Sequence, residues 1–228
     1  MSRLIFILQE KGGEWKSTLA VHLAHHLRSI GHSFLLADLD FEDRLFTRYD
    51  PGCKAYSPDA TKLAARDSNV LDLVYLMRQG SNILIDCGGN SLGCWDVLFQ
   101  IEPTLLEDLE QKGTKITLIV PVSDNYDTQQ YVSRYDEIFG PRATKVLAAA
   151  KGVDVRKLAS FPGYREDRTF VIPRMPDCLA LMVDALAKPA GVISAMDPAT
   201  LPFPVGFARD ADRQFSAAFT RMIEHLKP

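Results

Sequence analysis

Short apolar runs separated by polar, turn-forming stretches recur along the chain and predict buried β-strands. We expect six of them, at residues 3–8, 33–37, 82–85, 116–122, 145–149 and 170–172. Continuous apolar runs of this kind are typical of strands that are covered on both faces. The pattern therefore indicates a sheet that lies inside the molecule.

Apolar residues at helical spacing predict helices between the strands. In the first helix, residues 17–30, Leu19 and Leu23 follow this spacing, and Gly31 ends it. Because strands and helices alternate, we expect a doubly wound α/β fold with a mainly parallel sheet and helices on both faces. Residues 41–68 are expected to form a long loop with at most one short helix. Further helices are expected at residues 69–78, 95–111, 126–138, 178–187 and 210–226.

Composition and length favour one globular domain over residues 1–228. The chain has 46% hydrophobic and 24% charged residues, and no Gly/Ser-rich linker divides it. No apolar run approaches the roughly 18–20 residues of a membrane span, and the first residues do not resemble a signal peptide, so we expect a cytoplasmic protein. Four scattered cysteines are expected to be reduced thiols: Cys53, Cys87, Cys94 and Cys178.

The charge is distributed unevenly, although the net charge of −3 gives no overall preference for nucleic acid. Residues 1–140 hold 13 Lys and Arg against 20 Asp and Glu, a net of −7, so residues 141–228 carry +4. This asymmetry fits an anionic partner for the C-terminal third and equally fits an ordinary mixed surface. The basic residues that would form such a surface are Arg156, Lys157, Arg165, Arg168 and Arg174.

A glycine-containing turn joins the first strand to the first helix and predicts a phosphate-binding site. Residues 11–18 read KGGEWKST. The backbone N–H groups of such a turn and the helix dipole both face an anion at the helix N-terminus. In that arrangement Lys16 reaches the β- and γ-phosphates of a nucleotide, and the Ser17 hydroxyl contacts Mg²⁺.

Aspartates end two of the buried strands. Asp38 and Asp40 end the second strand, where the alternation of side chains puts both carboxylates on one side of the chain. Asp86 ends the third strand and delivers one carboxylate toward a metal ion. Ligands of doubly wound sheets bind beyond the carboxyl ends of the strands. We therefore expect these carboxylates to lie near the phosphate-binding turn.

Together these motifs resemble the ParA/MinD family of ATPases, whose deviant Walker A loop reads Lys-Gly-Gly-x-Gly-Lys-Ser/Thr and whose Asp-x-Asp and Walker B aspartate follow. Lys11 is the residue that distinguishes this loop from ordinary P-loops. Trp15 stands where the family has glycine, at a point where the loop backbone takes conformations that are awkward for a side chain. Pro173 lies in a segment that resembles the family's segment near the adenine base.

The resemblance implies a P-loop NTPase fold with a site for ATP or ADP and Mg²⁺. It assigns to Asp40 the positioning of the attacking water. The implied catalytic residues are Lys11, Lys16 and Asp40. The implied metal-binding residues are Ser17, Asp38 and Asp86. The implied nucleotide-binding residues are Gly12, Gly13, Glu14, Trp15, Lys16, Ser17, Thr18 and Pro173.

The resemblance also implies a function, that of an ATP-dependent switch in the segregation or positioning of plasmid DNA or another large cargo. Such a protein forms a homodimer through bound ATP, with Lys11 reaching the phosphates of the partner subunit. We expect a partner or adaptor protein and non-specific DNA contacts through the C-terminal basic residues, but neither a membrane partner nor an N-terminal helix-turn-helix.

Two alternatives stay open. Trp15 in place of glycine favours an impaired pseudo-ATPase that serves as a nucleotide-sensing or interaction module. A metabolic relative would use the same loop to activate a carboxylate substrate.

Other signals have structural interpretations. We expect His22 and His26 to line a solvent-facing or interdomain surface and not to hold a metal ion. The apolar stripe of the last helix, which includes Phe219, is expected to pack against the sheet. Trp95 is expected to be a core or interface anchor.

Overall fold

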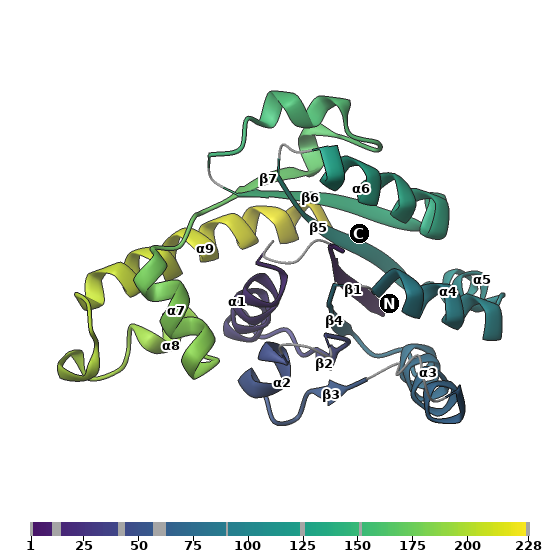
Figure 1. The fold of residues 1–228 in the computed structure, drawn as a ribbon, viewed down its shortest axis with the longest axis horizontal. Helices are drawn as coiled ribbons and strands as arrows, with labels where there is room; N and C mark the ends of the chain where they lie inside the picture. Colours follow the sequence, from purple (N-terminus) through teal and green to yellow (C-terminus); the bar gives the residue numbers. More distant parts are fainter. Residues whose placement is uncertain are drawn as a thin grey trace.

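The structure is a computed structural model that describes residues 2–10, 15–40, 44–56, 63–89, 91–123, 126–150 and 152–226. Within these ranges the strands are β1 Arg3–Leu8, β2 Leu35–Asp38, β3 Lys54–Ala55, β4 Ile83–Cys87, β5 Lys115–Val122, β6 Ala143–Ala150 and β7 Thr169–Ile172. They form one parallel sheet in the order β3-β2-β4-β1-β5-β6-β7 (Figure 1). β1 lies between β4 and β5, where the connections diverge to the two sides of the sheet, and ligands of such folds bind at this point.

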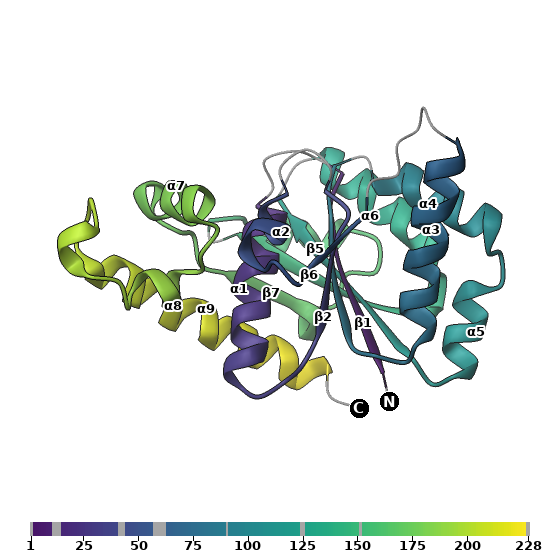
Figure 2. The ribbon, with the colours of Figure 1, turned by 90° about the horizontal axis from the view of Figure 1, so that it is seen from below.

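Helices cover both faces of the sheet, as the edge-on view in Figure 2 shows. One face carries α1 Lys16–Ser29, α2 Leu45–Tyr49, α7 Asp177–Leu186, α8 Ala190–Ile193 and α9 Val205–Leu226. The other carries α3 Leu63–Arg78, α4 Ser91–Ile101, α5 Leu105–Gln111 and α6 Tyr126–Phe139. Short 3₁₀ helices lie at Gly140–Arg142, Val155–Ser160, Glu166–Arg168 and Pro198–Thr200. The doubly wound α/β fold with a parallel sheet, expected from the alternating pattern, is confirmed.

The strands divide their side chains between two apolar layers. Ile5 and Ile7 of β1 belong to the layer of α1, α7, α8 and α9. Leu4, Phe6 and Leu8 belong to the layer of α3, α4, α5 and α6. Because successive side chains of a strand point to opposite faces, a strand buried on both sides must be apolar at nearly every position. This requirement explains the continuous apolar runs in the sequence.

Trp95 of α4 is a core residue, as expected. Its ring is 1% exposed and packs edge-on against Phe6, with the ring centroids 5.0 Å apart. Phe139 of α6 meets the same indole edge-on at 5.8 Å. These rings join β1, α4 and α6 in one apolar layer.

All six predicted strands are present, and the differences concern short or interrupted elements. β3 has two exposed residues and pairs only with β2, so neither apolarity nor periodicity marks it. α2 is the one short helix allowed in the expected loop at 41–68, but that loop also contains β3. α3 begins at Leu63, six residues before the expected start at 69, so the expected loop is too long. The helix expected at 95–111 is divided into α4 and α5, with Pro103 between them, since proline cannot continue a helix. α9 begins before the expected residue 210.

The expected position of the α1 histidines is wrong. His22 and His26 are 3% and 5% exposed, and they pack against Phe215 and Phe219 of α9. Since α1 packs against the sheet, α2 and α9, residues on most of its circumference are buried, and helical spacing could not identify an exposed face. The expected packing of α9 through its apolar stripe is confirmed by its buried Phe219 and Met222.

Among the described residues Cys53, Cys87 and Cys178 form no disulfide, in agreement with the expected reduced thiols, whereas the Cys94 side chain lies outside them. No helix in the described ranges is long and apolar enough to cross a bilayer.

Candidate functional site

The site begins where β1 meets α1. Of the predicted residues, Lys11, Gly12, Gly13 and Glu14 lie outside the described ranges. α1 begins at Lys16, whose side chain is buried beside the equally buried Ser17. Both residues occupy the first turn, where backbone N–H groups have no partner within the helix and favour an anion. Thr18 follows in the same turn and is half-buried.

Trp15 has the backbone conformation that favours glycine. Its φ and ψ are 49° and 28°, in the left-handed region, and its carbonyl accepts the Leu19 N–H over 2.9 Å. A side chain in this conformation costs about 1–2 kcal/mol. The indole is half-buried and packs against the α1-side layer, and this contact offsets part of the cost. Trp15 thus adopts the left-handed backbone conformation that glycine would adopt here, and α1 begins directly after it.

Gln9 is a site residue that the sequence analysis missed. It lies directly after β1, is fully buried, and its amide donates to the Pro121 carbonyl of β5 over 2.8 Å. This bond ties the start of the phosphate-binding turn to the neighbouring strand. A polar residue directly after a wholly apolar strand was the available signal.

Asp86 is the most deeply buried carboxylate of the site. Burial raises the pKa of this carboxyl to about 8, and the negative charges of Asp38 and Asp40 add to the rise. The nearby Ser17 hydroxyl and the Lys16 ammonium oppose it. Neither Asp86 oxygen has a hydrogen-bond partner among the described residues. A buried carboxylate without donors is costly, and a cation would satisfy it.

Asp38 is the register partner of Asp86 in the parallel pairing of β2 and β4. Its buried carboxylate accepts the Asp40 N–H over 2.9 Å and the Thr47 N–H and hydroxyl over 2.9 and 2.8 Å. Burial raises its pKa, and the Thr47 and Asp40 hydrogen bonds oppose this rise. The Arg44 guanidinium donates to its backbone carbonyl over 3.4 Å.

Asp40 lies against a glycine that follows β4. A Cβ on Gly88 would lie 2.7 Å from both Cα and Cγ of Asp40, and a Cβ on Gly89 would lie 3.3 Å from the Glu10 carbonyl oxygen. The absence of side chains here lets the ends of β2 and β4 approach each other. The sequence showed the glycine pair, but not which residue approaches it.

Pro173 is apart from this group of residues. It follows β7 at the edge of the sheet, with β6 and β5 between it and β1. It lines a surface hollow of about 260 Å³ together with Val171, Gln214, Ala217, Ala218 and Arg221. The assignment of Pro173 to the nucleotide site stays a prediction.

The donor set suits Mg²⁺ with a nucleotide. No three His, Cys, Asp or Glu side chains in the described ranges converge as a complete metal cage. Mg²⁺ is usually bound by one or two carboxylates together with phosphate oxygens and water, so it needs no such cage. Asp86, Asp38 and the Ser17 hydroxyl could supply the protein share of this coordination, and the first turn of α1 the phosphate contacts.

Two of the C-terminal basic residues, Arg156 and Arg165, are exposed and paired with carboxylates. Arg156 contacts Asp154 at 3.1 Å, and Arg165 contacts Asp167 at 2.9 Å. Such exposed pairs are weak and exchange readily with other anions. These two ion pairs therefore neither support nor contradict the predicted DNA contacts of the arginines.

The sequence matches one family and the fold matches several solved structures. The sequence model of the family described as ATPase MipZ matches residues 3–142. MinD from Aquifex aeolicus is similar with a TM-score of 0.56 at 15% identity, over 100% of this chain and 99% of that one. McdA from Cyanothece has a TM-score of 0.54 at 15% identity, over 100% of both chains.

A putative plasmid partition protein from Borrelia burgdorferi B31, bound to AMPPNP, has a TM-score of 0.56 at 14% identity, over 99% of this chain and 98% of that one. At these identities the likeness shows the fold alone. No curated protein sequence matches the chain.

Proposed function

Because the chain belongs to the MipZ family of ATPases, which are of the ParA/MinD type, we propose that it is a Mg-ATP-dependent switch that segregates or positions plasmid DNA or another large cargo. The observation that carries the proposal is the environment of Asp86. This carboxylate is fully buried next to Lys16 and Ser17, and its oxygens have no donors among the described residues. The Mg²⁺ ion of a bound nucleotide complex would supply the missing positive charge.

Each described site residue has a role that follows from its position. The Lys16 ammonium binds phosphate oxygens and neutralises their charge, and the first turn of α1 donates N–H groups to the same anion. Ser17, Asp38 and Asp86 hold the metal side of the complex. Asp40 orients the attacking water. Bound Mg²⁺ supplies the positive charge that stabilises the transferring phosphoryl group.

A homodimer through bound ATP is part of the proposal. Lys11 would reach the phosphates of the partner subunit, so that hydrolysis requires two subunits. An adaptor protein would respond to the ATP-bound dimer, and the exposed Arg156 and Arg165 would exchange their carboxylate partners for DNA phosphates. The single sheet with an apolar layer on each face supports treating residues 1–228 as one domain.

Calorimetric titration with ATP in the presence of Mg²⁺ tests nucleotide binding, and phosphate release at several protein concentrations tests dimer-dependent turnover. We expect micromolar binding and a rate per subunit that rises with protein concentration. Lys11→Ala should bind ATP as a monomer and lose this concentration dependence. Absence of binding by the folded protein at millimolar ATP would rule the proposal out.

A second candidate function is favoured by the left-handed backbone of Trp15. A protein that keeps the helix start but carries an indole in the loop could bind nucleotide without turnover and act as a nucleotide-sensing interaction module. Tight binding without phosphate release, even with its partner protein present, would distinguish this candidate from the ATPase.

A further inference from the structure

The carboxylate of Asp38 is held by a residue that no sequence motif marks. Thr47 of α2 donates twice to Asp38 Oδ2, from its backbone N–H over 2.9 Å and from its hydroxyl over 2.8 Å. Oδ1 accepts the Asp40 N–H over 2.9 Å. One carboxylate oxygen thus has two donors and the other has one.

This asymmetry directs the carboxylate. A carboxylate has about four acceptor positions, two on each oxygen. Thr47 fills both positions of Oδ2, whereas Oδ1 keeps one after accepting from Asp40, as far as the described residues show. The position that stays open on Asp38 therefore belongs to Oδ1. Its register partner Asp86 lies beside it on β4.

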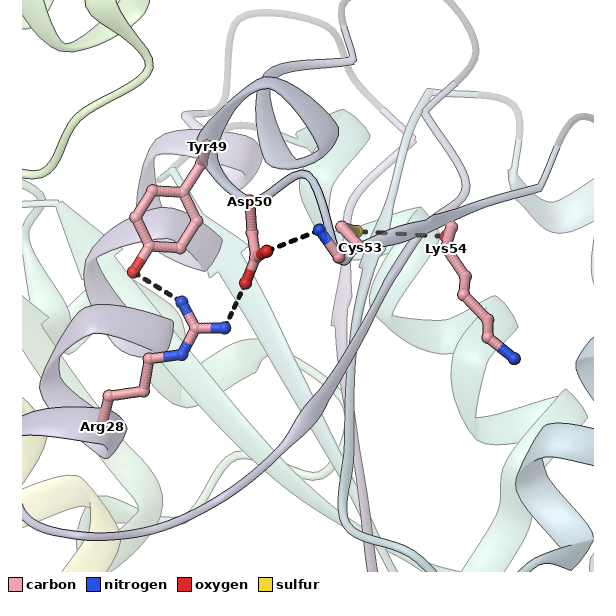
Figure 3. Close-up of polar contacts among 6 residues, drawn as sticks. Arg28, Tyr49, Asp50, Cys53 and Lys54 are labelled. Atoms are coloured by element: carbon pink, nitrogen blue, oxygen red, sulfur yellow. Dashed lines mark hydrogen bonds and ion pairs between the residues drawn. The ribbon is translucent and has the colours of Figure 1, made fainter.

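The helix that carries Thr47 is held firmly by its flanking residues. Phe46 is fully buried in the α1-side layer. At the end of α2, the Arg28 guanidinium donates to the Tyr49 hydroxyl over 3.3 Å and pairs with the Asp50 carboxylate (Figure 3). The Asp50 carboxylate also accepts the Gly52 N–H over 2.7 Å. These contacts join α2 to α1 and fix the turn that follows.

A second arginine joins α2 to α7. Arg48 donates to the Asp184 carbonyl over 2.9 Å and to its carboxylate over 3.1 Å. One partly exposed ion pair is weak, but here it adds to a buried aromatic anchor and the Arg28 contacts. Since neighbours on both sides of Thr47 are fixed, its hydroxyl is a preorganised donor.

We propose that Thr47 is a positioning residue, which orients the Asp38 carboxylate so that Oδ1 faces the Mg²⁺–nucleotide complex. The inference rests on the proposed function, because it requires that this complex binds. If Thr47 has this role, α2 contributes to metal affinity although it lies outside the phosphate-binding loop and the aspartate motifs. Thr47 itself touches neither nucleotide nor metal.

The experiment compares ATP binding by calorimetry with Mg²⁺ and with EDTA. Thr47→Val keeps the side-chain shape and the backbone N–H but removes the hydroxyl, so Oδ2 keeps one donor and the carboxylate can turn. We expect the gain in ATP affinity that Mg²⁺ provides to fall about tenfold, with binding in EDTA unchanged. Thr47→Ser keeps the hydroxyl and should retain the wild-type Mg²⁺ dependence.

Thr117→Val is the matched control, since Thr117 is a buried threonine in β5, paired with Ile5 and away from the carboxyl ends of the strands. It should leave the Mg²⁺ dependence unchanged. Thermal unfolding of each variant reports the fold, and Thr47→Ala removes the same hydroxyl in a second way. Unfolding of both hydroxyl-free variants would assign Thr47 to the stability of α2 and overturn the proposal.

The other outcomes separate the two claims. An unchanged Mg²⁺ dependence in Thr47→Val, or an equal loss with and without Mg²⁺, would overturn the role of Thr47 while leaving the proposed function intact. Failure of the wild-type protein to bind ATP at all would overturn the proposed function, and the role of Thr47 with it.

Discussion

Asp40 and Gly88, which follow different strands, are packed so closely that a methyl group does not fit between them. A Cβ on Gly88 would lie 2.7 Å from both Cα and Cγ of Asp40. Ordinary contacts between carbon atoms are about 3.5–4.0 Å. The position of the carboxylate that we propose to orient water therefore depends on a glycine in the turn after β4.

Gly88→Ala should displace Asp40 and slow ATP hydrolysis by about tenfold to a hundredfold, since small misplacements of a reacting group have effects of this size. Overpacking should also lower the free energy of unfolding by about 1–3 kcal/mol. Phosphate release and urea unfolding measure the two effects. Gly93→Ala is the control, because nothing lies within 4 Å of a Cβ at this helical glycine. Equal rates in the two variants would contradict the prediction.

Replacement of Trp15 should separate backbone strain from side-chain packing. Both Trp15→Gly and Trp15→Ala remove the contacts of the half-buried indole, but only glycine adopts the φ of 49° without strain. We expect the glycine variant to be about 1 kcal/mol more stable than the alanine variant in urea unfolding. Greater stability of the alanine variant would show that the residue leaves the left-handed region in solution.

Asp86 should make the nucleotide-free protein less stable as the pH rises. Its folded-state pKa of about 8 lies above the unfolded value of about 3.9, so the folded state binds more protons between these values and loses stability from pH 4 to pH 8. Asp86→Asn should remove this loss and be about 1 kcal/mol or more stabilising at pH 8, with little difference at pH 4.

Urea unfolding at several pH values checks the prediction, with Asp72→Asn, at an exposed carboxylate of α3, as the control. Parallel pH profiles of wild type and Asp86→Asn would contradict it. In the presence of Mg²⁺ and ATP the same substitution should weaken binding, because the metal requires the charged carboxylate.

His22 should contribute to acid destabilisation. Its Nδ1–H donates to the Thr18 carbonyl over 2.8 Å and its Nε2 accepts the Ala190 N–H over 3.0 Å, which requires the neutral ring. Burial lowers its pKa to about 4, below the unfolded value of 6.5. The unfolded state therefore binds more protons between these values, and stability is lost as the pH falls from 6.5 to 4.

His22→Leu should flatten this part of the pH profile while costing about 1–3 kcal/mol at pH 7, because the buried Ala190 N–H loses its acceptor. The free energy of unfolding, measured by chemical unfolding at about pH 4.5, 5.5 and 7, checks the prediction. His32→Leu, which replaces an exposed histidine, is the control. A wild-type slope in His22→Leu would show that other groups cause the acid loss.

The sequence by itself determined the layered fold and the main features of the candidate site. Burial on both faces forces a parallel strand to be apolar throughout, so β1 and the other long strands are visible as runs. Lys16, Ser17, Asp38 and Asp86 are also visible, because strand ends and a helix N-terminus have local signatures and the carboxyl ends of parallel strands meet at one edge. Short β3 has no such signature.

Only the tertiary structure decided how these residues are held. The alignment of Asp38 with Asp86 depends on the register of β2 and β4, and the approach of Asp40 to Gly88 depends on the turns that follow them. The burial of His22 depends on α9, which lies far away in sequence. Periodicity describes one element at a time, whereas register, close approach and burial are set by contacts between elements that are distant along the chain.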